Sequence, residues 1–207
     1  VPFEKMKLSS LNAGHSVLGI LGALLGYDTI DEAINNQNIS TFLNNYMDVE
    51  VTPTLGDLEG INLENYKKSL LERFGNINIK DQIDRICSET SAKFPIFILP
   101  TINTQLENKR AIKLAAFVTA AWAIYNLGLD ENGKFLNIKD AMIDVLHKKA
   151  MKATNKPQLF LEIETVFGGL KASEVFVKAY TNAYQNIIKN GVEKGITDLN
   201  NTILNKI

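Results

Sequence analysis

The stretch from Lys109 to Gly128 constrains the fold of this chain more than any other segment. Its sequence, KRAIKLAAFVTAAWAIYNLG, is apolar almost all the way round a helix, and it ends in a glycine, a typical stop signal. A helix without a polar face belongs in the middle of a domain, where other elements cover it on every side. We therefore expect Ala111 to Leu127 to form a buried central helix, with Trp122 inside the core.

Helical periodicity also dominates the rest of the sequence. NLENYKKSLLERFGN has its apolar residues on one face, Asn62 as its cap and Gly75 at its end, and SEVFVKAYTNAYQNIIKNG starts at Ser173. DTIDEAINN is a further helix, capped by Asp28 or Thr29. Strand signals are scarce, and LDENGKF is expected to form a turn or a tight hairpin tip. These patterns predict an all-α domain of roughly eight to ten helices.

The segment IKDQIDRICSETSAKF is predicted to be one helix that ends before Pro95, because a proline disfavours helical geometry in the residue before it. On such a helix Arg85 and Lys93 are eight residues apart and point in similar directions, with Ser88 between them. Asp81 lies four residues before Arg85, so a surface ion pair explains the pattern equally well. The next run, PIFILP, is either a buried connector or the start of another helix.

The composition argues against several classes of partner. The net charge is -1 with both signs interspersed, so the basic stripe that nucleic acids require is missing. The longest apolar run, Val17 to Leu25, is too short to span a bilayer, and its glycines favour close helix packing. The single cysteine, Cys87, rules out an internal disulfide, is expected in the core, and favours a reducing, cytoplasmic location. We therefore expect neither a nucleic-acid nor a membrane partner.

Motifs for metals and nucleotides are also missing. The chain has two histidines, His15 and His147, which form no close ligand pair, so no metal site is expected and His147 is assigned to the surface. The glycines of GILGALLG miss the GxGxxG spacing, and no strand precedes them. The sequence therefore identifies no cofactor-binding residues.

Three polar side chains gather near the start of the chain, in MKLSSLNAGHS. Lys7, Asn12 and His15 can all form hydrogen bonds, and a strongly apolar run follows them. On an ideal α-helix the three span less than half of the circumference, so they could line one cleft. A solvated helix start fits the same pattern, and these residues alone leave both interpretations open.

KMKLSSLNAGHS resembles the signature of the polyol-specific long-chain dehydrogenases and reductases, the mannitol 2-dehydrogenase family. That family has a lysine, four residues, an asparagine, two residues and a histidine, as Lys7, Asn12 and His15 have here. GYDTIDEAINNQNISTF, LLERFGNINIKDQIDRICSETSAKFPIFILPTI and LAAFVTAAWAIYNLGLDENG are similar to further blocks of the family. The resemblance covers at least Phe3 to Gly133.

The resemblance implies that residues 1–207 are a multi-helical C-terminal substrate domain, like that of 6-phosphogluconate dehydrogenase, without the N-terminal Rossmann domain that is its partner in the family. It also implies a metal-independent, NAD- or NADP-dependent exchange between a polyol and a 2-ketose of the mannitol/fructose type, with the cofactor bound mainly by the Rossmann domain. Lys7 would be the general acid/base, and Asn12 and His15 would donate hydrogen bonds to the reacting oxygen.

Arg85 and Lys93 match two further substrate-contacting positions of the family. Ser88, between them, stands where some members have a histidine. The identity of the small-molecule substrate is therefore left undecided. A reductase of keto-uronates, such as fructuronate or tagaturonate, is a close alternative. A helical interaction domain without activity is an alternative of a different class.

Overall fold

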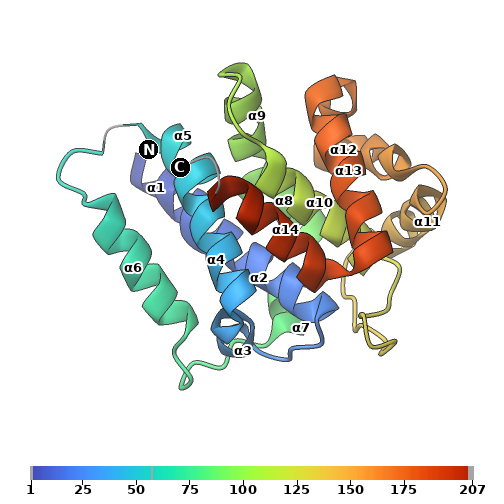
Figure 1. Cartoon of the computed structure of the whole chain (residues 1–207), viewed down its shortest axis with the longest axis horizontal. Helices are drawn as coiled ribbons and strands as arrows, with labels where there is room; N and C mark the ends of the chain where they lie inside the picture. The colour runs from blue at the N-terminus through green and yellow to red at the C-terminus, as the bar shows by residue number, and fades with distance from the viewer. Residues whose placement is uncertain (1, 57, 205–207) are drawn as a thin grey trace.

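The computed structural model of the chain describes residues 2–56 and 58–204 and confirms the all-α fold (Figure 1). In this part of the chain there is no β-strand, and extended pairing is limited to two isolated antiparallel bridges, Thr29 with Gln82 and Leu129 with Phe135. None of the helices described is long and apolar enough to cross a membrane.

The helices differ widely in length, from single turns of four residues to one of seventeen. The predicted eight to ten helices are too few, because periodicity does not reveal the single turns. The α-helices of the described residues are α1 (Pro2–Met6), α2 (Ala13–Leu24), α3 (Ile30–Asn35), α4 (Gln37–Asn45), α5 (Thr52–Leu55), α6 (Leu63–Phe74), α7 (Ile83–Ile86), α8 (Thr90–Phe97), α9 (Leu99–Glu107), α10 (Lys113–Tyr125), α11 (Ile143–Ala153), α12 (Glu164–Phe167), α13 (Glu174–Asn190) and α14 (Val192–Leu204). The described residues also form two π-helical segments, η1 (Lys7–Asn12) and η2 (Tyr46–Val51), and two 3-10 segments, η3 (Pro157–Glu162) and η4 (Leu170–Ala172).

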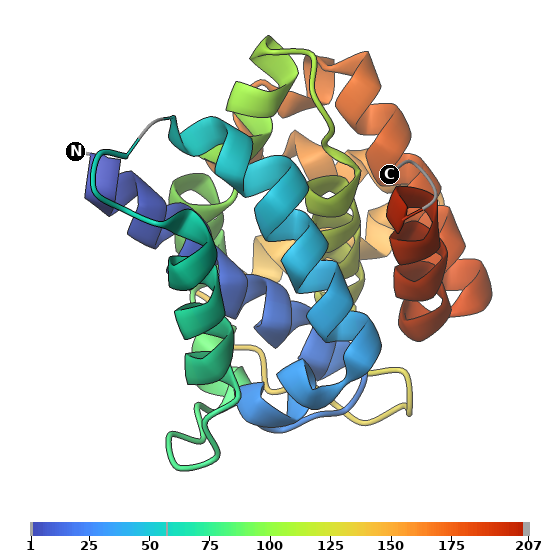
Figure 2. The ribbon, with the colours of Figure 1, turned by 60° about the vertical axis from the view of Figure 1, so that its left-hand side comes forward.

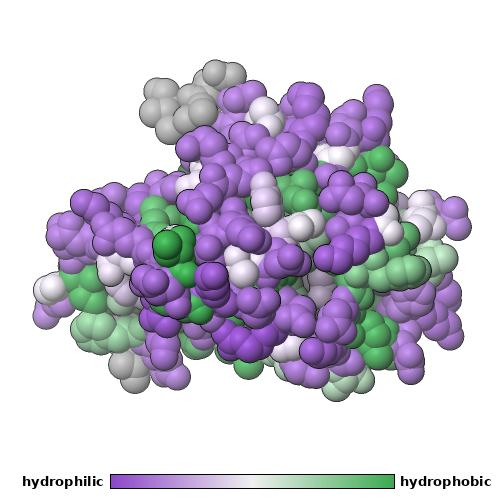
Figure 3. All heavy atoms as spheres, turned by 90° about the horizontal axis from the view of Figure 1, so that it is seen from below, coloured by the Kyte–Doolittle hydropathy of each residue, from purple (hydrophilic) through white to green (hydrophobic). Residues whose placement is uncertain are grey.

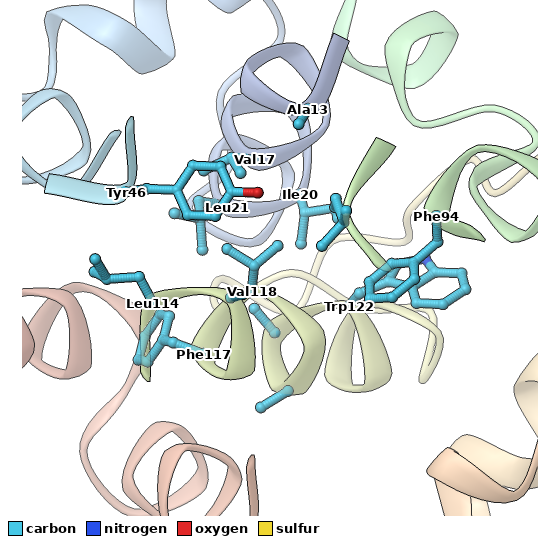
Figure 4. Packing of buried hydrophobic residues seen from close by; sticks show 14 of the residues in the cluster. Ala13, Val17, Ile20, Leu21, Tyr46, Phe94, Leu114, Phe117, Val118 and Trp122 are labelled. Atoms are coloured by element: carbon cyan, nitrogen blue, oxygen red, sulfur yellow. The ribbon is translucent and has the colours of Figure 1, made fainter. Parts of the chain in front are cut away.

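The helix α10 lies at the centre of the core, as its sequence predicts. It packs against α2 on one side and α13 on another. Figure 4 shows Val118 of α10 facing Val17 and Leu21 of α2, while Phe94 of α8 stacks on Trp122. Trp122 is 1% exposed, so the expectation that it is buried is confirmed.

A buried glutamate caps the N-terminus of α10. Glu50, on η2, accepts hydrogen bonds from the backbone N–H groups of Leu114 and Ala115 at 2.7 and 2.8 Å. First-turn N–H groups have no partner within their own helix, so the carboxylate satisfies two of them. Burial raises the pKa of Glu50 to about 8, although the two backbone donors favour its ionised form. The sequence pattern did not single out this residue.

The glycines of α2 allow the segment around α7 to approach closely, as predicted. A Cβ atom on Gly19 would lie 2.9 Å from Sγ of Cys87, and one on Gly22 would lie 2.7 Å from Cδ1 of Ile83. Cys87 is buried in this contact, as expected. The result is that α7, which carries Arg85, lies directly against α2.

Local signals predicted several helix starts and one turn correctly. Thr29 forms a capping box with Glu32, Asn62 accepts from the N–H of Asn65, and Ser173 caps α13. The segment 129–135 is the predicted hairpin tip, closed by the isolated bridge at its two ends.

The prediction of one continuous helix before Pro95 is wrong. The chain forms α7, then a turn in which Glu89 has a φ of 52°, and then α8, which contains Pro95 within it. The backbone N–H of Glu89 donates to the carbonyl oxygen of Lys139 at 2.8 Å, and Asp140 accepts from the backbone N–H of Ser91 at 2.9 Å. A loop distant in sequence thus stabilises the turn between α7 and α8. The PIFILP run ends α8 and starts α9.

One helix stands apart from the rest of the bundle. The helix α6 lies on the outside of the bundle, at the left in Figure 1 and in front in Figure 2, and buries only Leu70 and Phe74, near its C-terminal end. Seen from below, the molecule has a mostly hydrophilic surface with small, separate apolar patches (Figure 3).

Candidate functional site

Lys7 and Asn12 are the first and last residues of η1, the π-helical segment that joins α1 to α2. A π-helical turn contains one more residue than an α-helical turn, so the angles of an ideal α-helix do not apply to the predicted trio. Ser9, Ser10 and Leu11 are buried beneath the segment, whereas Lys7 is exposed and Asn12 is half-buried. The buried middle of η1 therefore anchors the segment in the core, and Lys7 at its start is open to solvent.

His15 follows on α2 and is half-buried. The ring of Phe74, from α6, meets it edge-on with ring centroids 4.8 Å apart. Its Nε2 lies 3.5 Å from Oδ2 of Asp81. Burial lowers the pKa of His15, Asp81 opposes this shift, and the nearby cations Arg73 and Arg85 add to it. The net lowering favours the neutral imidazole at pH 7.

Arg85, Ser88 and Lys93 do not share one helix face, because the turn after α7 separates them. Arg85 is exposed on α7 and pairs with Asp81, as the ion-pair interpretation expected. Ser88 lies in the turn and donates its hydroxyl to the carbonyl of Arg85 at 2.7 Å. Lys93 lies on α8, where its Nζ donates to the carbonyl of Ile86 at 2.9 Å. Burial lowers the pKa of Lys93, and the charge of Arg85 lowers it further.

The structure connects the two groups of predicted residues. Asp81 links His15 to Arg85, and α8, which carries Lys93, packs against η1, which carries Lys7. Among the described residues, the side chains of Lys7 and Asn12 make no hydrogen bond or ion pair with one another or with the other four. The site is thus a common region with free polar groups rather than a closed network.

Two charged residues of this region were not recognised as part of it from the sequence. Asp81 was considered only as a surface partner of Arg85, and its contact with His15 joins distant parts of the chain. Arg73, at the end of α6, is close enough to His15 to lower its pKa, and it was not singled out at all. The spacing of four residues between Asp81 and Arg85 was the one local signal for either.

The described residues contain neither a cluster of metal-ligating side chains nor a Rossmann unit. No group of three or more His, Cys, Asp or Glu side chains in this part of the chain is placed to hold a metal ion. A Rossmann unit binds the pyrophosphate of a dinucleotide with a strand, a glycine-rich turn and a helix N-terminus, and no β-strand occurs among these residues. One cleft is lined by Tyr27, Asp28, Gln82, Asp84 and residues 134–137, and none of the six predicted residues lines it.

Comparison with known proteins decides the family. Residues 1–188 match the family described as the mannitol dehydrogenase C-terminal domain. The chain belongs to this family. Mannitol 2-dehydrogenases of the same family from Aspergillus niger and Neosartorya fischeri are 36% and 38% identical to it over 193 residues, or 93% of the chain. The chain spans 40% and 38% of the lengths of these two relatives.

Solved structures of the family agree. A Pseudomonas fluorescens mannitol 2-dehydrogenase, solved in a ternary complex with NAD and D-mannitol, matches 96% of this chain with a TM-score of 0.92 and 38% identity. A D-sorbitol dehydrogenase in substrate-free form matches 94% with a TM-score of 0.83 and 28% identity. The chain covers 40% of each of those chains. The family resemblance inferred from the sequence is therefore confirmed.

Proposed function

We propose that this chain is the substrate-binding and catalytic domain of an NAD(P)-dependent oxidoreductase that interconverts a polyol and a 2-ketose of the mannitol/fructose type. The observation that carries the proposal is the placement of Lys7, Asn12 and His15 at one end of α2, in a fold with a TM-score of 0.92 to an enzyme solved with NAD and D-mannitol. Because the matched relatives are more than twice as long, residues 1–207 act together with a Rossmann domain that binds the cofactor.

Lys7 is the general acid/base in this proposal. In alcohol oxidation, its neutral amine takes the proton of the reacting hydroxyl. A hydride passes to the dinucleotide from the carbon that bears this hydroxyl. A lysine acts as a general base only through its neutral amine. Ketone reduction uses the same group as an acid. The exposed position of Lys7 on η1 supports this role, since a substrate can reach its amine directly.

Asn12 and His15 bind the substrate oxygens next to Lys7. The side-chain amide of Asn12 donates to the reacting oxygen and stabilises alkoxide character, because such donors act on the charge that develops in the transition state. His15 forms a hydrogen bond to the substrate from the opposite end of the same short segment. These assignments require no metal ion, since the lysine moves the proton.

Arg85, Ser88 and Lys93 hold the far end of an open-chain sugar. The guanidinium of Arg85 and the amine of Lys93 donate to hydroxyl groups, and the small Ser88 leaves room between them. Arg85 already has Asp81 as its carboxylate partner, and this favours a neutral polyol over a substrate that brings a second carboxylate.

A keto-uronate reductase is the second candidate, and one observation favours it. Three cations, Arg73, Arg85 and Lys93, lie in this region, and among the described residues only Arg85 of the three forms an ion pair, with Asp81. Arginine binds carboxylates through two parallel hydrogen bonds, so a uronate would also suit these cations.

Steady-state kinetics of the full-length enzyme distinguish the candidates. We would measure NAD(H)- and NADP(H)-linked turnover of fructose, mannitol, arabinitol, fructuronate and tagaturonate. The proposal predicts a larger kcat/KM for fructose than for fructuronate. A ratio well below one would favour the uronate reductase, and no turnover of any of these compounds would favour an interaction domain.

A further inference from the structure

We propose that Asp81 is a positioning residue, whose carboxylate holds the His15 ring and the Arg85 guanidinium in one arrangement so that Nδ1 of His15 accepts a hydrogen bond from the substrate. This inference rests on the proposed function, because it assigns the orientation of a group in the same site. It gives Asp81 a task in substrate alignment that an ordinary surface ion pair would not have.

The two oxygens of Asp81 serve different partners. Oδ2 lies 3.5 Å from Nε2 of His15, and Oδ1 accepts from Nη2 of Arg85. The carboxylate is only 21% exposed, whereas the Arg85 side chain is 66% exposed. Asp81 therefore lies between the two predicted parts of the site and is the more shielded member of its pair.

The backbone around Asp81 is fixed by contacts with a distant segment. The carbonyl of Asp81 accepts from the N–H of Ile30 at 3.0 Å, and the N–H of Ile83 donates to the carbonyl of Asp28 at 2.9 Å. These bonds flank the isolated bridge between Thr29 and Gln82. Because α3 and α7 both pack on α2, this bridge holds the carboxylate at a set place relative to His15.

The chemistry of the pair sets the tautomer of His15. An ionised carboxylate only accepts hydrogen bonds, so the neutral ring keeps its proton on Nε2, beside Asp81. Nδ1 then carries the lone pair and can accept from a hydroxyl. The reacting hydroxyl gives its proton to Lys7, so the partner of Nδ1 is a neighbouring hydroxyl of the substrate. His15 in this arrangement aligns the sugar, and Asn12 is the donor to the reacting oxygen.

The charges that face His15 come from three elements. Arg73 lies on α6, Arg85 on α7, and Asp81 on the segment between them, with the uncharged ring of Phe74 against the imidazole. Asp81 is the only one of these groups that favours the protonated ring. Replacing it by the neutral Asn leaves the imidazole facing two cations, and the pKa of His15 falls.

Nuclear magnetic resonance of the 207-residue chain directly tests whether Asp81 orients the His15 ring. The chain has two histidines, and His147, whose Nδ1 lies 2.9 Å from the carbonyl of Asn126, serves as an internal reference for folding. In the wild type, nitrogen shifts should show His15 with its proton on Nε2. Asp81→Asn should lower the pKa of His15 and remove the tautomer preference, without changing His147. Asp81→Glu, which keeps the charge, should retain most of the wild-type titration.

The matched control is Asp84→Asn. Asp84 lies on α7, accepts from Asn137 at 3.1 Å and pairs with Lys139, so its loss should not alter His15. In the full-length enzyme, Asp81→Asn should raise KM by about three- to tenfold, more than it lowers kcat. It should also move the acid limb of kcat/KM to lower pH, because neutral His15 is the active form.

The possible failures are distinct. An unchanged tautomer and titration of His15 in Asp81→Asn would overturn the positioning role, as would an equal rise of KM in Asp84→Asn. A wild-type enzyme without polyol or ketose turnover would overturn the proposed function and, with it, the substrate-aligning part of this inference. The resonance data would then still show whether Asp81 holds His15.

Discussion

The described part of the chain contains two π-helical segments, and the environments of their polar residues differ. η1 exposes Lys7 at one end and leaves Asn12 half-buried at the other, whereas η2 buries Tyr46 and Glu50. Glu50 points its carboxylate at the start of α10 rather than at solvent. The wide turn alone therefore does not define a functional site. The two segments differ in what their polar residues face, which is solvent for Lys7 and the core for Glu50.

The largest expected effect separates the two segments by activity. Lys7→Ala should lower kcat of the full-length enzyme by about 10²–10⁴-fold, the usual contribution of a general acid/base, and leave folding intact. Added small amines should partly restore turnover. Lys178→Ala, which removes an exposed lysine of α13, is the control and should leave turnover unchanged. Near-normal kcat for Lys7→Ala would contradict the assignment.

The second effect concerns stability and belongs to η2. Glu50→Ala should lower the free energy of unfolding by about 2–5 kcal/mol, because two N–H groups of α10 lose their acceptor inside the core. Asp48→Ala is the control on the same segment, since Asp48 is half-exposed and bonded to Lys67, and surface pairs contribute about 0–1 kcal/mol. Urea titration measures both. Equal losses would remove the contrast between η1 and η2.

The pH dependence of stability sharpens the description of η2. Burial raises the pKa of Glu50 to about 8, above that of an unfolded glutamate, so the folded chain binds a proton that the unfolded chain releases. Its contribution is present below about pH 4.3 and is lost as the pH rises through about 8. Wild type should therefore lose on the order of a few kcal/mol relative to Glu50→Gln between pH 5 and 8. The opposite slope would mean that the α10 N–H groups keep Glu50 ionised.

The smallest of these effects concerns substrate contact near η1. Arg85→Ala should lower kcat/KM for fructose. The loss should correspond to about 1–3 kcal/mol of transition-state stabilisation, as expected for one lost polar contact. The same change should nearly abolish activity on a keto-uronate, because a buried carboxylate would lose its charged partner. Arg110→Ala, at an exposed arginine bonded to the carbonyl of Pro53, is the control. Unchanged kinetics for both substrates would leave Arg85 with Asp81 alone.

Local sequence signals were sufficient for much of the fold. The caps at Thr29, Asn62 and Ser173 act within one turn, so their side chains and their targets are visible together in the sequence. The apolar pattern of α10 likewise predicted burial, because a helix without a polar face has no stable exposed position. The family signature placed Lys7, Asn12 and His15 in one segment, and they do follow one another along η1 and α2.

The remaining features depend on contacts between distant residues. The break at Glu89 is held by the loop at Lys139 and Asp140, and no glycine marks it in the sequence. For this reason Arg85 and Lys93 were wrongly placed on one helix. The pairing of His15 with Asp81 and the closing of α10 by Glu50 are equally non-local. Nothing in local composition distinguishes either π-helical turn from an ordinary helix.

The stack of Phe94 on Trp122 makes the tryptophan fluorescence of the chain sensitive to the position of α8, the helix that carries Lys93. Trp122 is the single tryptophan, so all indole emission arises at this position. Its ring lies 5.3 Å from that of Phe94, nearly parallel, and Phe94 directly follows Lys93 on α8. Phe160 and Phe167 enclose the other edges. A ligand that shifts α8 would alter this aromatic cage, and we expect the tryptophan fluorescence of the 207-residue chain to change on its binding without an added label.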